Sequence, residues 1–446
     1  MTTYWCELAW LGDVEGAVEH GVAITVNGDR ITGVESGATA AAGDVRLRGL
    51  TIPGIANGHS HAFHRALRGR THGDAGSFWT WRDTMYALAD RLEPDSYRDL
   101  ATATFAEMVL AGFTSVGEFH YLHHGRRGDR YAEPNAMGEA LLDAAATAGI
   151  RITLLDTCYL RAGIDAGIEL NHTQMRFSDG DVDAWALRAD QLVGSDDARI
   201  GAAIHSVRSV PAAAMPVVAE WATSRGAVLH PHVSEQPAEN EQCLARNGRT
   251  PVELLDARGV LNDRFTAVHA THLNDHDVAL VRSSNSTCCI CPTTERDLAD
   301  GIGPTEAFQA AGVAMSIGSD SHAVIDPFEE TRAIELDHRL ASLRRGTHGA
   351  GQLLQIATAS GCRSLGWKDA GRLASGALAD FVTVSLTSPR LAGTDPIHAA
   401  AAVVFAATAS DVQHVVVGGK VIVADGVHQS IDVGAELART IAAVWS

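Results

Sequence analysis

The sequence contains no long apolar run. Nowhere do about 18 apolar residues follow one another, the length that indicates a membrane-spanning helix. The segment Met1–Glu7 also lacks a basic stretch followed by an apolar one, which is the pattern of a secretion signal. We therefore expect no membrane span and a cytoplasmic location.

Cysteines are few and irregularly spaced. There are seven, an odd number, which favours a reduced compartment over a disulfide framework. Three of them cluster at residues 288–291 within an apolar stretch of β type. We interpret these thiols as small buried hydrophobic groups rather than as a metal-binding knuckle.

Basic residues are scarce as well. The chain has 35 Lys and Arg against 54 Asp and Glu, a formal net charge of −19 at pH 7. This balance argues against nucleic acid or an anionic membrane as a partner, and an anionic ligand would have to meet locally concentrated arginines. With 446 residues, of which 46% are hydrophobic, the chain is long enough for a large barrel and an accessory part.

Both ends of the chain are rich in short β-type segments. Near the N-terminus, the runs 21–26 and 30–34 flank Asn-Gly-Asp, a hairpin signal. Near the C-terminus, similar runs occupy 379–384, 414–417 and 420–423. We expect residues 1–52 and 371–446 to form one small sheet domain together, and residues 53–370 to form the catalytic domain.

The middle of the chain alternates apolar β-type runs with Ala/Leu-rich stretches of helical period, the mark of βα units and a parallel sheet. Eight runs occur, at residues 50–56, 114–117, 151–155, 200–204, 227–229, 265–268, 287–290 and 313–317. The helical candidates include 96–111, 136–148 and 211–224, the last with Ser209 as N-cap and Pro211 near its first turn. Eight repeats over roughly 300 residues predict a (β/α)8 barrel, an α/β fold.

Polar residues that can bind a metal or move a proton follow nearly every run. They are His59 and His61 after the first run; Glu118, His120 and Tyr121 after the second; Asp156 after the third; His205 and Arg208 after the fourth; His230, His232 and Glu235 after the fifth; His269 and His272 after the sixth; and Asp320 and His322 after the eighth. Barrel active sites are built at the C-terminal ends of the strands. The repeated placement therefore predicts an active site at that end.

His59 and His61 can close on one metal ion, because side chains at i and i+2 of a strand point the same way. Neutral imidazole is a common zinc ligand. With His232 and Asp320 the chain offers the three or four protein ligands that a hydrolytic zinc site needs. These four residues are our predicted metal ligands.

A hydrolytic site also needs a group that carries protons. Glu235, three residues after His232, can take a proton from the attacking water and deliver it to the leaving group. His269 is a candidate for an acid/base or for orienting the water, and Asp320 shares the orienting role. We predict Glu235, His269 and Asp320 as catalytic residues.

At these positions the chain resembles the amidohydrolase superfamily. The superfamily pattern is His-x-His after strand 1, a histidine after each of strands 5 and 6, and an aspartate after strand 8. It implies a TIM-like (β/α)8 barrel with a composite β-sandwich from both termini. Residues 371–380 are similar to the segment with which that superfamily returns into the sandwich.

The positions of the two lysines decide which type of metal centre this resemblance implies. Dinuclear members bridge two ions through a carbamylated lysine after strand 4, but this chain has only Lys368 and Lys420, both beyond the eight runs. A lysine-bridged dinuclear centre therefore cannot form. We expect a mononuclear centre with one divalent ion per chain, Zn²⁺.

Within the superfamily the chain is similar to the formimidoylglutamate deiminases. The segments that carry this resemblance are 58–63, 77–82, 117–124, 205–208, 230–236, 269–272, 291–295 and 318–322. The resemblance implies hydrolysis of N-formimino-L-glutamate, a small dianionic amidine, to N-formyl-L-glutamate and ammonia in histidine degradation. It also favours a homodimer, although the residues themselves do not indicate an oligomeric state.

The same resemblance assigns substrate contacts. Arg82, Tyr121, His205 and Arg208 would hold the two carboxylates, which suits arginine because its guanidinium binds carboxylates in a bidentate manner. His64 stands where the family often has glutamine, near the formimino end of the substrate. Histidine can also form a hydrogen bond there.

Two other interpretations stay open at this point. One is a mononuclear deaminase of a heterocycle such as guanine or a pterin, for which Arg82 and Arg208 would be superfluous. The other is a non-catalytic relative on the same barrel. The second would be favoured by loss of Glu235 or of a metal ligand, and none of these residues is missing.

Overall fold

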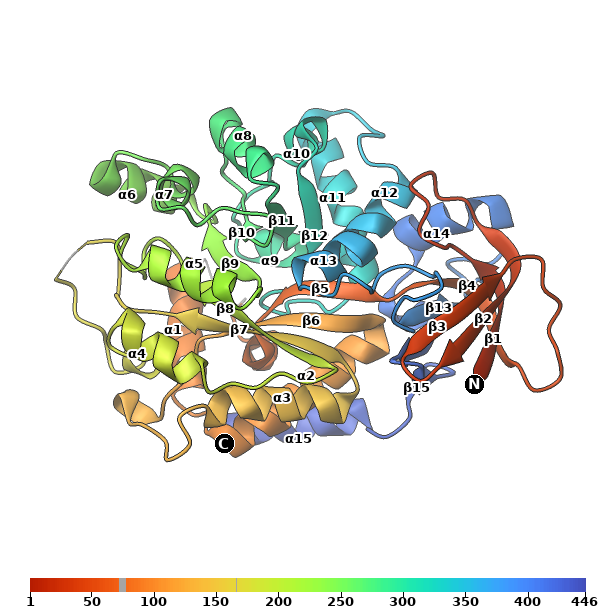
Figure 1. The fold of residues 1–446 in the computed structure, drawn as a ribbon, viewed down its shortest axis with the longest axis horizontal. Coiled ribbons are helices and arrows are strands. Elements are labelled where there is room, and N and C mark those ends of the chain that lie inside the picture. Colours follow the sequence, from red (N-terminus) through yellow and green to blue (C-terminus); the bar gives the residue numbers. More distant parts are fainter. Residues whose placement is uncertain (72–77, 166) are drawn as a thin grey trace.

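The computed structural model describes residues 1–71, 78–165 and 167–446, and Ser77 of one matched segment lies outside them. The described strands form two eight-stranded sheets, one at each side of Figure 1. One sheet belongs to the barrel and the other to the β-sandwich part. This arrangement confirms the predicted fold class.

The sandwich sheet is assembled from both ends of the chain. Its strands are β1 (Thr2–Ala9), β2 (Glu19–Asn27), β3 (Arg30–Glu35), β4 (Val45–Pro53), β13 (Phe381–Val384), β14 (Val412–Val417), β15 (Lys420–Ala424) and β16 (Val427–His428). Strands β4 and β13 pair antiparallel, with Phe381 opposite Pro53, and so join the two ends of the chain. The predicted hairpin is β2–β3, which Gly28 and Asp29 connect.

The barrel sheet consists of parallel strands in sequence order. They are β5 (Ile55–Ser60), β6 (Phe113–His120), β7 (Arg151–Cys158), β8 (Ala198–Ile204), β9 (Leu229–Val233), β10 (Thr266–His269), β11 (Thr287–Ile290) and β12 (Ala314–Ile317). The first and last strands meet through the residues that follow them. The Asp320 N–H donates to the His59 carbonyl at 3.0 Å, and the His61 N–H donates to the Asp320 carbonyl at 3.1 Å.

The first predicted run, 50–56, is divided between the two sheets. Its first half belongs to β4 and its second half to β5, with Gly54 between them. A Cβ atom at Gly54 would lie 2.2 Å from Thr114 Oγ1, so a larger residue does not fit at this crossing. The apolar run therefore continues through both parts of the protein, and the exact domain limits stay a prediction.

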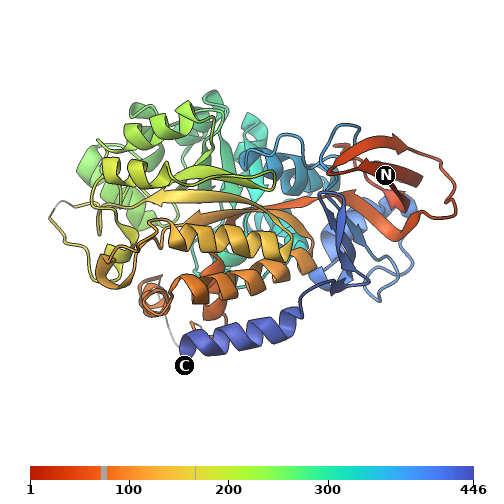
Figure 2. The same ribbon diagram turned by 60° about the horizontal axis from the view of Figure 1, so that its bottom comes forward.

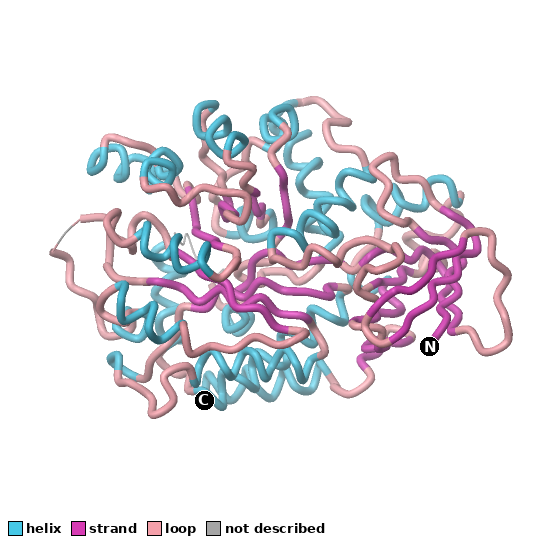
Figure 3. Tube along the Cα trace, in the orientation of Figure 1, coloured by secondary structure: helices cyan, strands magenta, loops and turns pink. Residues whose placement is uncertain are grey.

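Helices surround the barrel strands (Figure 3, cyan). The α-helices are α1 (Phe78–Ala89), α2 (Pro94–Ala111), α3 (Ala136–Ala148), α4 (Val182–Ala189), α5 (Met215–Ser224), α6 (Pro237–Asn247), α7 (Pro251–Ala257), α8 (Asp275–Ser283), α9 (Pro292–Asp297), α10 (Thr305–Ala311), α11 (Pro327–Ser342), α12 (Ala350–Gln355), α13 (Gly361–Ser364), α14 (Ala399–Ala406) and α15 (Val433–Trp445). Short turns of other helix types are η1 (Ala62–Leu67), η2 (Arg126–Gly128), η3 (Gln174–Phe177), η4 (Ile356–Ser360), η5 (Pro396–His398) and η6 (Ala409–Asp411). No helix in the described ranges is long and apolar enough to cross a membrane.

The ends of two helices, α2 and α5, can be compared with the signals in the sequence. Helix α2 begins at Pro94 and ends before Gly112, which has φ 110° in the left-handed region and so suits a C-cap. The predicted start of α5 was wrong: its N-cap is Ala214, with Pro216 in the first turn. Ser209 instead accepts the N–H groups of Leu160 and Arg161 through its carbonyl, which ties the β8–α5 loop to the loop after β7.

The C-terminal helix α15 packs along α2 on the outside of the barrel (Figure 2). Its Trp445 donates a hydrogen bond from Nε1 to the carbonyl of Ala66 at 2.9 Å. Ala66 lies in η1, the turn that directly follows β5 and carries His64. The end of the chain therefore supports the first loop of the barrel.

Candidate active site

The four predicted metal ligands lie together at the C-terminal end of the barrel. His59 lies in β5, His61 directly after it, His232 in β9 and Asp320 after β12. The Nε2 atom of His232 is 3.1 Å from that of His59 and 3.4 Å from that of His61. Asp320 Oδ1 is 3.2 Å from His59 Nε2 and 3.3 Å from His61 Nε2. All four side chains are buried.

These separations fit a tetrahedral zinc site. Ligand atoms about 2.0 Å from a tetrahedral ion lie about 3.3 Å from one another. The Nδ1 atom of His61 donates to the Phe119 carbonyl at 3.0 Å, and that of His232 donates to the His205 carbonyl at 3.0 Å. A carbonyl can only accept, so a neutral ring held in this way points an Nε2 lone pair toward the other donors.

Burial keeps the histidine rings neutral. It lowers the pKa of His61 to about 3, and it lowers the pKa of His232 well below the ordinary value. Two facing lone pairs repel each other unless a cation lies between them, and a carboxylate is the fourth donor. The residues present therefore fit one divalent cation.

The predicted proton-transfer residues lie beside this cluster. His269 Nε2 is 3.9 Å from Glu235 Oε1 and 4.0 Å from Asp320 Oδ2. His269 and Asp320 both have left-handed backbone conformations, with φ 67° and 40°. Such conformations cost energy in residues other than glycine and gather at functional sites. The structure brings all three predicted catalytic residues together.

All five predicted substrate contacts line one cavity of about 120 Å³ beside the cluster. These residues are His64, Arg82, Tyr121, His205 and Arg208. His64 Nε2 and the Tyr121 hydroxyl form a hydrogen bond of 3.0 Å. The cavity also contains Glu235, His269 and Asp320, so predicted binding and catalytic groups share one space.

Arg208 lies between two carboxylates in this cavity. Its Nη2 atom is 3.7 Å from Glu235 Oε2, and its Nε atom is 3.7 Å from Glu239 Oε2. The Arg208 side chain is 18% exposed and the Glu239 side chain 1%. Sequence reasoning missed Glu239, which lies in the first turn of α6, four residues after Glu235.

A buried hydrogen-bond chain supports the cluster from behind, and sequence reasoning missed it too. Glu118 binds the Ser60 hydroxyl at 2.6 Å and accepts the Ala62 N–H at 2.7 Å. Ser60 in turn lies 3.1 Å from His322 Nε2, and His322 Nδ1 lies 3.0 Å from Ser319 Oγ. The chain links the residues around His59 and His61 to those around Asp320. Burial raises the pKa of Glu118 to about 8.

Several residues that follow barrel strands lie away from the site. Asp156 accepts Trp185 Nε1–H at 2.8 Å and Arg188 Nη1–H at 2.8 Å, and His120 and His123 lie beside it. His230 binds the Ser364 carbonyl at 2.9 Å. His272 binds the Asp300 carbonyl at 2.8 Å. These residues have structural partners, and the predicted site does not include them.

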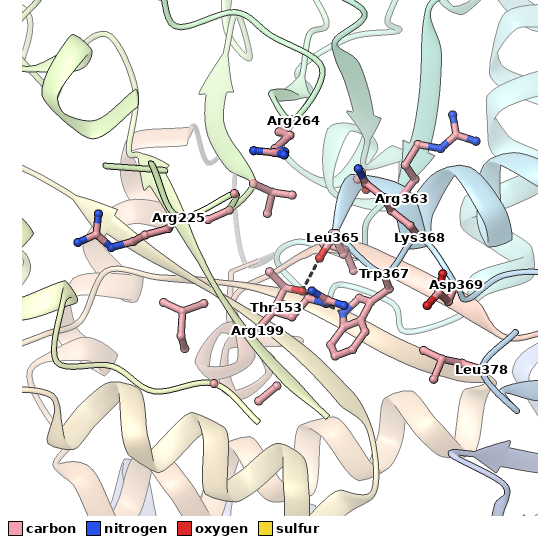
Figure 4. A pocket seen from close by; sticks show the side chains of 18 of the residues that line it. Thr153, Arg199, Arg225, Arg264, Arg363, Leu365, Trp367, Lys368, Asp369 and Leu378 are labelled. Carbon is pink, nitrogen blue, oxygen red and sulfur yellow. Dashed lines mark hydrogen bonds between the residues drawn. The ribbon is translucent and has the colours of Figure 1, made fainter. Parts of the chain in front are cut away.

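A larger cavity, of about 1210 Å³, lies at the opposite end of the barrel (Figure 4). Its lining comes from the beginnings of the strands, and Thr153 donates there to the Leu365 carbonyl at 2.8 Å. Trp367 packs under the guanidinium of Arg199, 4.2 Å from the ring centre. The described lining contains none of the predicted site residues. The N-terminal face of such barrels usually serves stability.

Comparison with known proteins agrees with the fold. Residues 50–422 match the model of the amidohydrolase family. The chain is 35% identical to formimidoylglutamate deiminase of Pseudomonas aeruginosa over 401 residues, which cover 87% of this chain and 88% of that protein. The chain belongs to the amidohydrolase family. As an amidohydrolase it is a hydrolase of carbon–nitrogen bonds.

The chain is also similar to relatives whose names give other substrates or none. The chain is 30% identical to the 5-methylthioadenosine/S-adenosylhomocysteine deaminase of Moorella thermoacetica, and the match covers 94% of both chains. A solved structure described as an amidohydrolase from Brucella melitensis has a TM-score of 0.91 and 31% identity over 100% of both chains. An adenosine deaminase from Xanthomonas campestris, solved with bound zinc, has a TM-score of 0.84 at 23% identity and covers 98% of this chain and 96% of its own. This last likeness supports the fold alone.

Proposed function

We propose that this amidohydrolase hydrolyses N-formimino-L-glutamate to N-formyl-L-glutamate and ammonia, as part of histidine degradation. The observation that carries the proposal is the position of Arg208, 3.7 Å from Glu235 inside the cavity that Arg82 also lines. Two arginines beside a proton-carrying carboxylate suit a substrate with two carboxylates. The 35% identity to a formimidoylglutamate deiminase supports the same substrate class.

We propose His59, His61, His232 and Asp320 as the ligands of one zinc ion per chain. The mutual distances of 3.1–3.4 Å between their donor atoms support this ligand set. A zinc ion held there would act as a Lewis acid that lowers the pKa of water toward ~7. The Phe119 and His205 carbonyls orient two of the imidazole rings by accepting their Nδ1–H groups.

The proposed proton path runs through Glu235. Its carboxylate accepts a proton from the attacking water, and Asp320 and His269 hold the water at the formimino carbon. The formimino nitrogen of the protonated amidine is an amino group after the attack, and Glu235 donates the proton to it. The carbon–nitrogen bond then breaks, ammonia leaves, and the proton still on the oxygen passes to Glu235 as the carbonyl forms. The carbon keeps the oxygen of the water, which gives the formyl product. General acid–base transfer of this kind contributes about 10²- to 10⁴-fold to a rate.

The other pocket residues would bind and orient the substrate. Arg208 and Arg82 would face its carboxylates, with His205 beside them. Tyr121, which the resemblance assigns to a carboxylate, is hydrogen-bonded to His64. We therefore place this pair at the formimino end, because it lies next to His61, with 4.6 Å between the His64 and His61 ring centres. Binding energy from the remote carboxylates then positions the reacting carbon.

The size of the cavity favours a small substrate. Its volume of about 120 Å³ is below the ~300–1,000 Å³ of pockets for drug-sized ligands. A thioether of adenosine, as in both substrates in the name of the Moorella relative, would need considerably more space. The volume leaves a single small heterocycle as the competing substrate class.

We further propose that the protein acts as a homodimer in the cytoplasm. The resemblance to formimidoylglutamate deiminases supports the dimer. The seven cysteines, all buried and all free thiols, support a reducing compartment. Light scattering of the purified protein would test the dimer.

An ammonia-release assay tests the proposed reaction. N-formimino-L-glutamate is offered beside N-formimino-L-aspartate, guanine and S-adenosylhomocysteine, and Glu235→Gln serves as the control protein. We expect N-formimino-L-glutamate to have the highest kcat/KM and the control to be nearly inactive. Ammonia release from guanine without turnover of N-formimino-L-glutamate would overturn the proposal in favour of a heterocycle deaminase.

A further inference from the structure

A second set of metal-binding side chains lies next to the predicted zinc ligands. His269, Cys291 and Glu295 are buried, and their ligand atoms lie within 4.8 Å of one another. His269 ends β10, Cys291 directly follows β11, and Glu295 lies in the first turn of α9. The four predicted zinc ligands come from β5, β9 and β12 and the residues that follow them, so the second set occupies the part of the barrel rim between β9 and β12.

The Nδ1 atom of His269 points into this second set. It lies 3.5 Å from Glu295 Oε1, and among the described residues it finds no hydrogen-bond partner of suitable geometry. The His269 side chain is only 1% exposed. Glu295 is therefore an ion-pair partner of His269 without a hydrogen bond of good geometry between them, and an ion bound between the two groups would satisfy both. The separation of 3.5 Å is close to the ~3.3 Å expected for two ligands of one tetrahedral ion.

The two sets differ in chemistry. The first offers three imidazole nitrogens and one carboxylate, whereas the second includes a thiol. Thiolate sulfur prefers Zn²⁺ and similar soft or borderline ions over Mg²⁺ or Ca²⁺. Three protein ligands leave one coordination position open for water.

We propose that His269, Cys291 and Glu295 form a second, weaker site for a thiophilic divalent cation such as Zn²⁺, and that its occupation inhibits the enzyme. On binding, the Cys291 S–H bond and the His269 Nδ1–H bond break, a sulfur–metal and a nitrogen–metal bond form, and both protons pass to water. The Nδ1 lone pair of His269 and a Glu295 oxygen complete the protein ligands. No oxidation or reduction takes place.

Inhibition follows from the two faces of the His269 ring. Its Nε2 atom faces Glu235 and Asp320, 3.9 and 4.0 Å away. Coordination at Nδ1 fixes the ring and places a metal ion behind it, so His269 can no longer adjust its position to hold the attacking water. His269 lines the substrate cavity, whereas Cys291 and Glu295 lie outside its lining. The ion therefore enters through the active site.

Cobalt(II) titration distinguishes the two sites spectroscopically. A cobalt–thiolate bond gives a charge-transfer band in the near ultraviolet, and only the second site contains a sulfur ligand. The metal-free full-length protein is titrated with cobalt while metal content and absorbance are followed. We expect the first equivalent to bind without that band and a second to produce it. Further equivalents without the band would overturn the proposal.

Two variants and one matched control assign the band. Cys291→Ala removes the sulfur, and Glu295→Gln weakens the site while keeping the thiol, which covers the case that the first variant folds poorly. Cys158→Ala removes a buried thiol from β7 instead. We expect the band to disappear in Cys291→Ala, to need more cobalt in Glu295→Gln and to be unchanged in Cys158→Ala. A band that persists in Cys291→Ala would contradict the assignment.

An activity measurement completes the test and rests on the proposed function only through the choice of substrate. Excess zinc should inhibit the wild type, and the inhibitory zinc concentration should rise by about tenfold or more in Cys291→Ala. Equal inhibition of both proteins would refute the inhibitory role. The cobalt band needs no substrate, so failure on N-formimino-L-glutamate would overturn the proposed reaction without affecting the spectroscopic result.

Discussion

The Nε2 atoms of His61 and His232 lie 3.4 Å apart, and each ring donates its Nδ1–H to a backbone carbonyl. The hydrogen bonds fix the rings with their unprotonated nitrogens facing each other. Without a cation this arrangement is repulsive, and with one it is a prepared ligand pair. The backbone of β6 and of His205, directly after β8, thus prepares the proposed metal site before any ion binds.

Removal of the ion should therefore destabilise the folded protein. After dialysis against metal-free buffer, we expect about one tightly bound divalent ion per chain and a higher melting temperature than in chelator-treated protein. His232→Ala and Asp320→Asn should lose the ion and melt like the chelated wild type. Metal analysis and calorimetry check both points. Two tightly held equivalents in fully active protein would contradict the mononuclear centre.

Glu235→Gln should keep the ion and lose turnover. Glutamine preserves the shape of the side chain but cannot carry a proton, so kcat should fall by about 10²- to 10⁴-fold. Glu239→Gln is the matched control, because Glu239 also lies 3.7 Å from Arg208. We expect the control to retain most of its kcat. An equal loss in both variants would mean that the charge around Arg208 matters, rather than proton transfer by Glu235.

The sequence predicted the barrel well because apolar runs mark buried strands and because eight of them alternate with helical periods. It predicted less well which side chains face the interior. Glu118 and Phe119 are neighbours on β6, yet Phe119 packs against His232 with ring centres 4.3 Å apart, whereas Glu118 points to Ser60 behind the site. Neighbouring side chains of a strand alternate between faces, and the order of residues does not say which face is inside.

Arg82→Met and Arg208→Met should each lower kcat/KM for N-formimino-L-glutamate by a factor that corresponds to about 2–4 kcal/mol. Each change leaves one substrate carboxylate without its cation. Steady-state kinetics with the full-length protein measures the effect. Full activity of both variants on this substrate would sink the proposed carboxylate contacts.

The two arginine variants should differ in stability. Arg208 lies between Glu235 and Glu239, so its removal takes away the cation that the two buried carboxylates share. Breaking such an arrangement costs about 3–5 kcal/mol of unfolding free energy. Arg82, half-buried at the edge of the cavity, should cost clearly less when replaced. Denaturant unfolding of both variants compares them.

His64→Gln should preserve activity on N-formimino-L-glutamate within about tenfold. Glutamine has both a donor and an acceptor and can keep the 3.0 Å hydrogen bond to the Tyr121 hydroxyl. His64→Leu, which removes that bond in a similar volume, serves as the comparison and should lose more. Steady-state kinetics of the three proteins ranks them. If glutamine and leucine behave alike, His64 has no polar role at the formimino end.

Glu118 should make stability depend on pH. Burial raises the pKa of its carboxyl from its ordinary value of 4.5 to about 8 in the folded protein. Between these values the folded state holds a proton that the unfolded state has released. Glu118 therefore contributes its full stability below pH 4.5 and loses roughly 1.4 kcal/mol per pH unit up to pH 8.

Glu118→Gln, which stays uncharged, isolates this effect. The difference in unfolding free energy between wild type and variant should fall as the pH rises from 5 to 8 and then level off. The pH dependence of the metal ligands is common to both proteins and cancels. Denaturant unfolding at a series of pH values measures this difference in unfolding free energy. A difference that does not change with pH would show that Glu118 is ionised throughout.

What the sequence left out at the site was mainly supporting residues. Glu295 and Cys291 were recognised as part of a family segment, but only the structure places them behind His269. Their spacing from His269 along the chain carries no signal, because the barrel brings together ends of strands that are far apart in sequence. The proposed ligands were easier to predict, since the His-x-His spacing of His59 and His61 at the end of a strand is visible in the sequence.

The contacts that join β5 to β12 and close the barrel also limit when the proposed metal site can form during synthesis of the protein. Asp320 supplies the last of the four donors and the backbone contacts to His59 and His61. A growing chain that ends before Asp320 has three imidazoles on strands that lack their closing neighbour. Neither the contacts between β5 and β12 nor the complete set of donors exists until Asp320 has left the ribosome. Loading of the proposed site can therefore be complete only after all eight barrel strands have been synthesised.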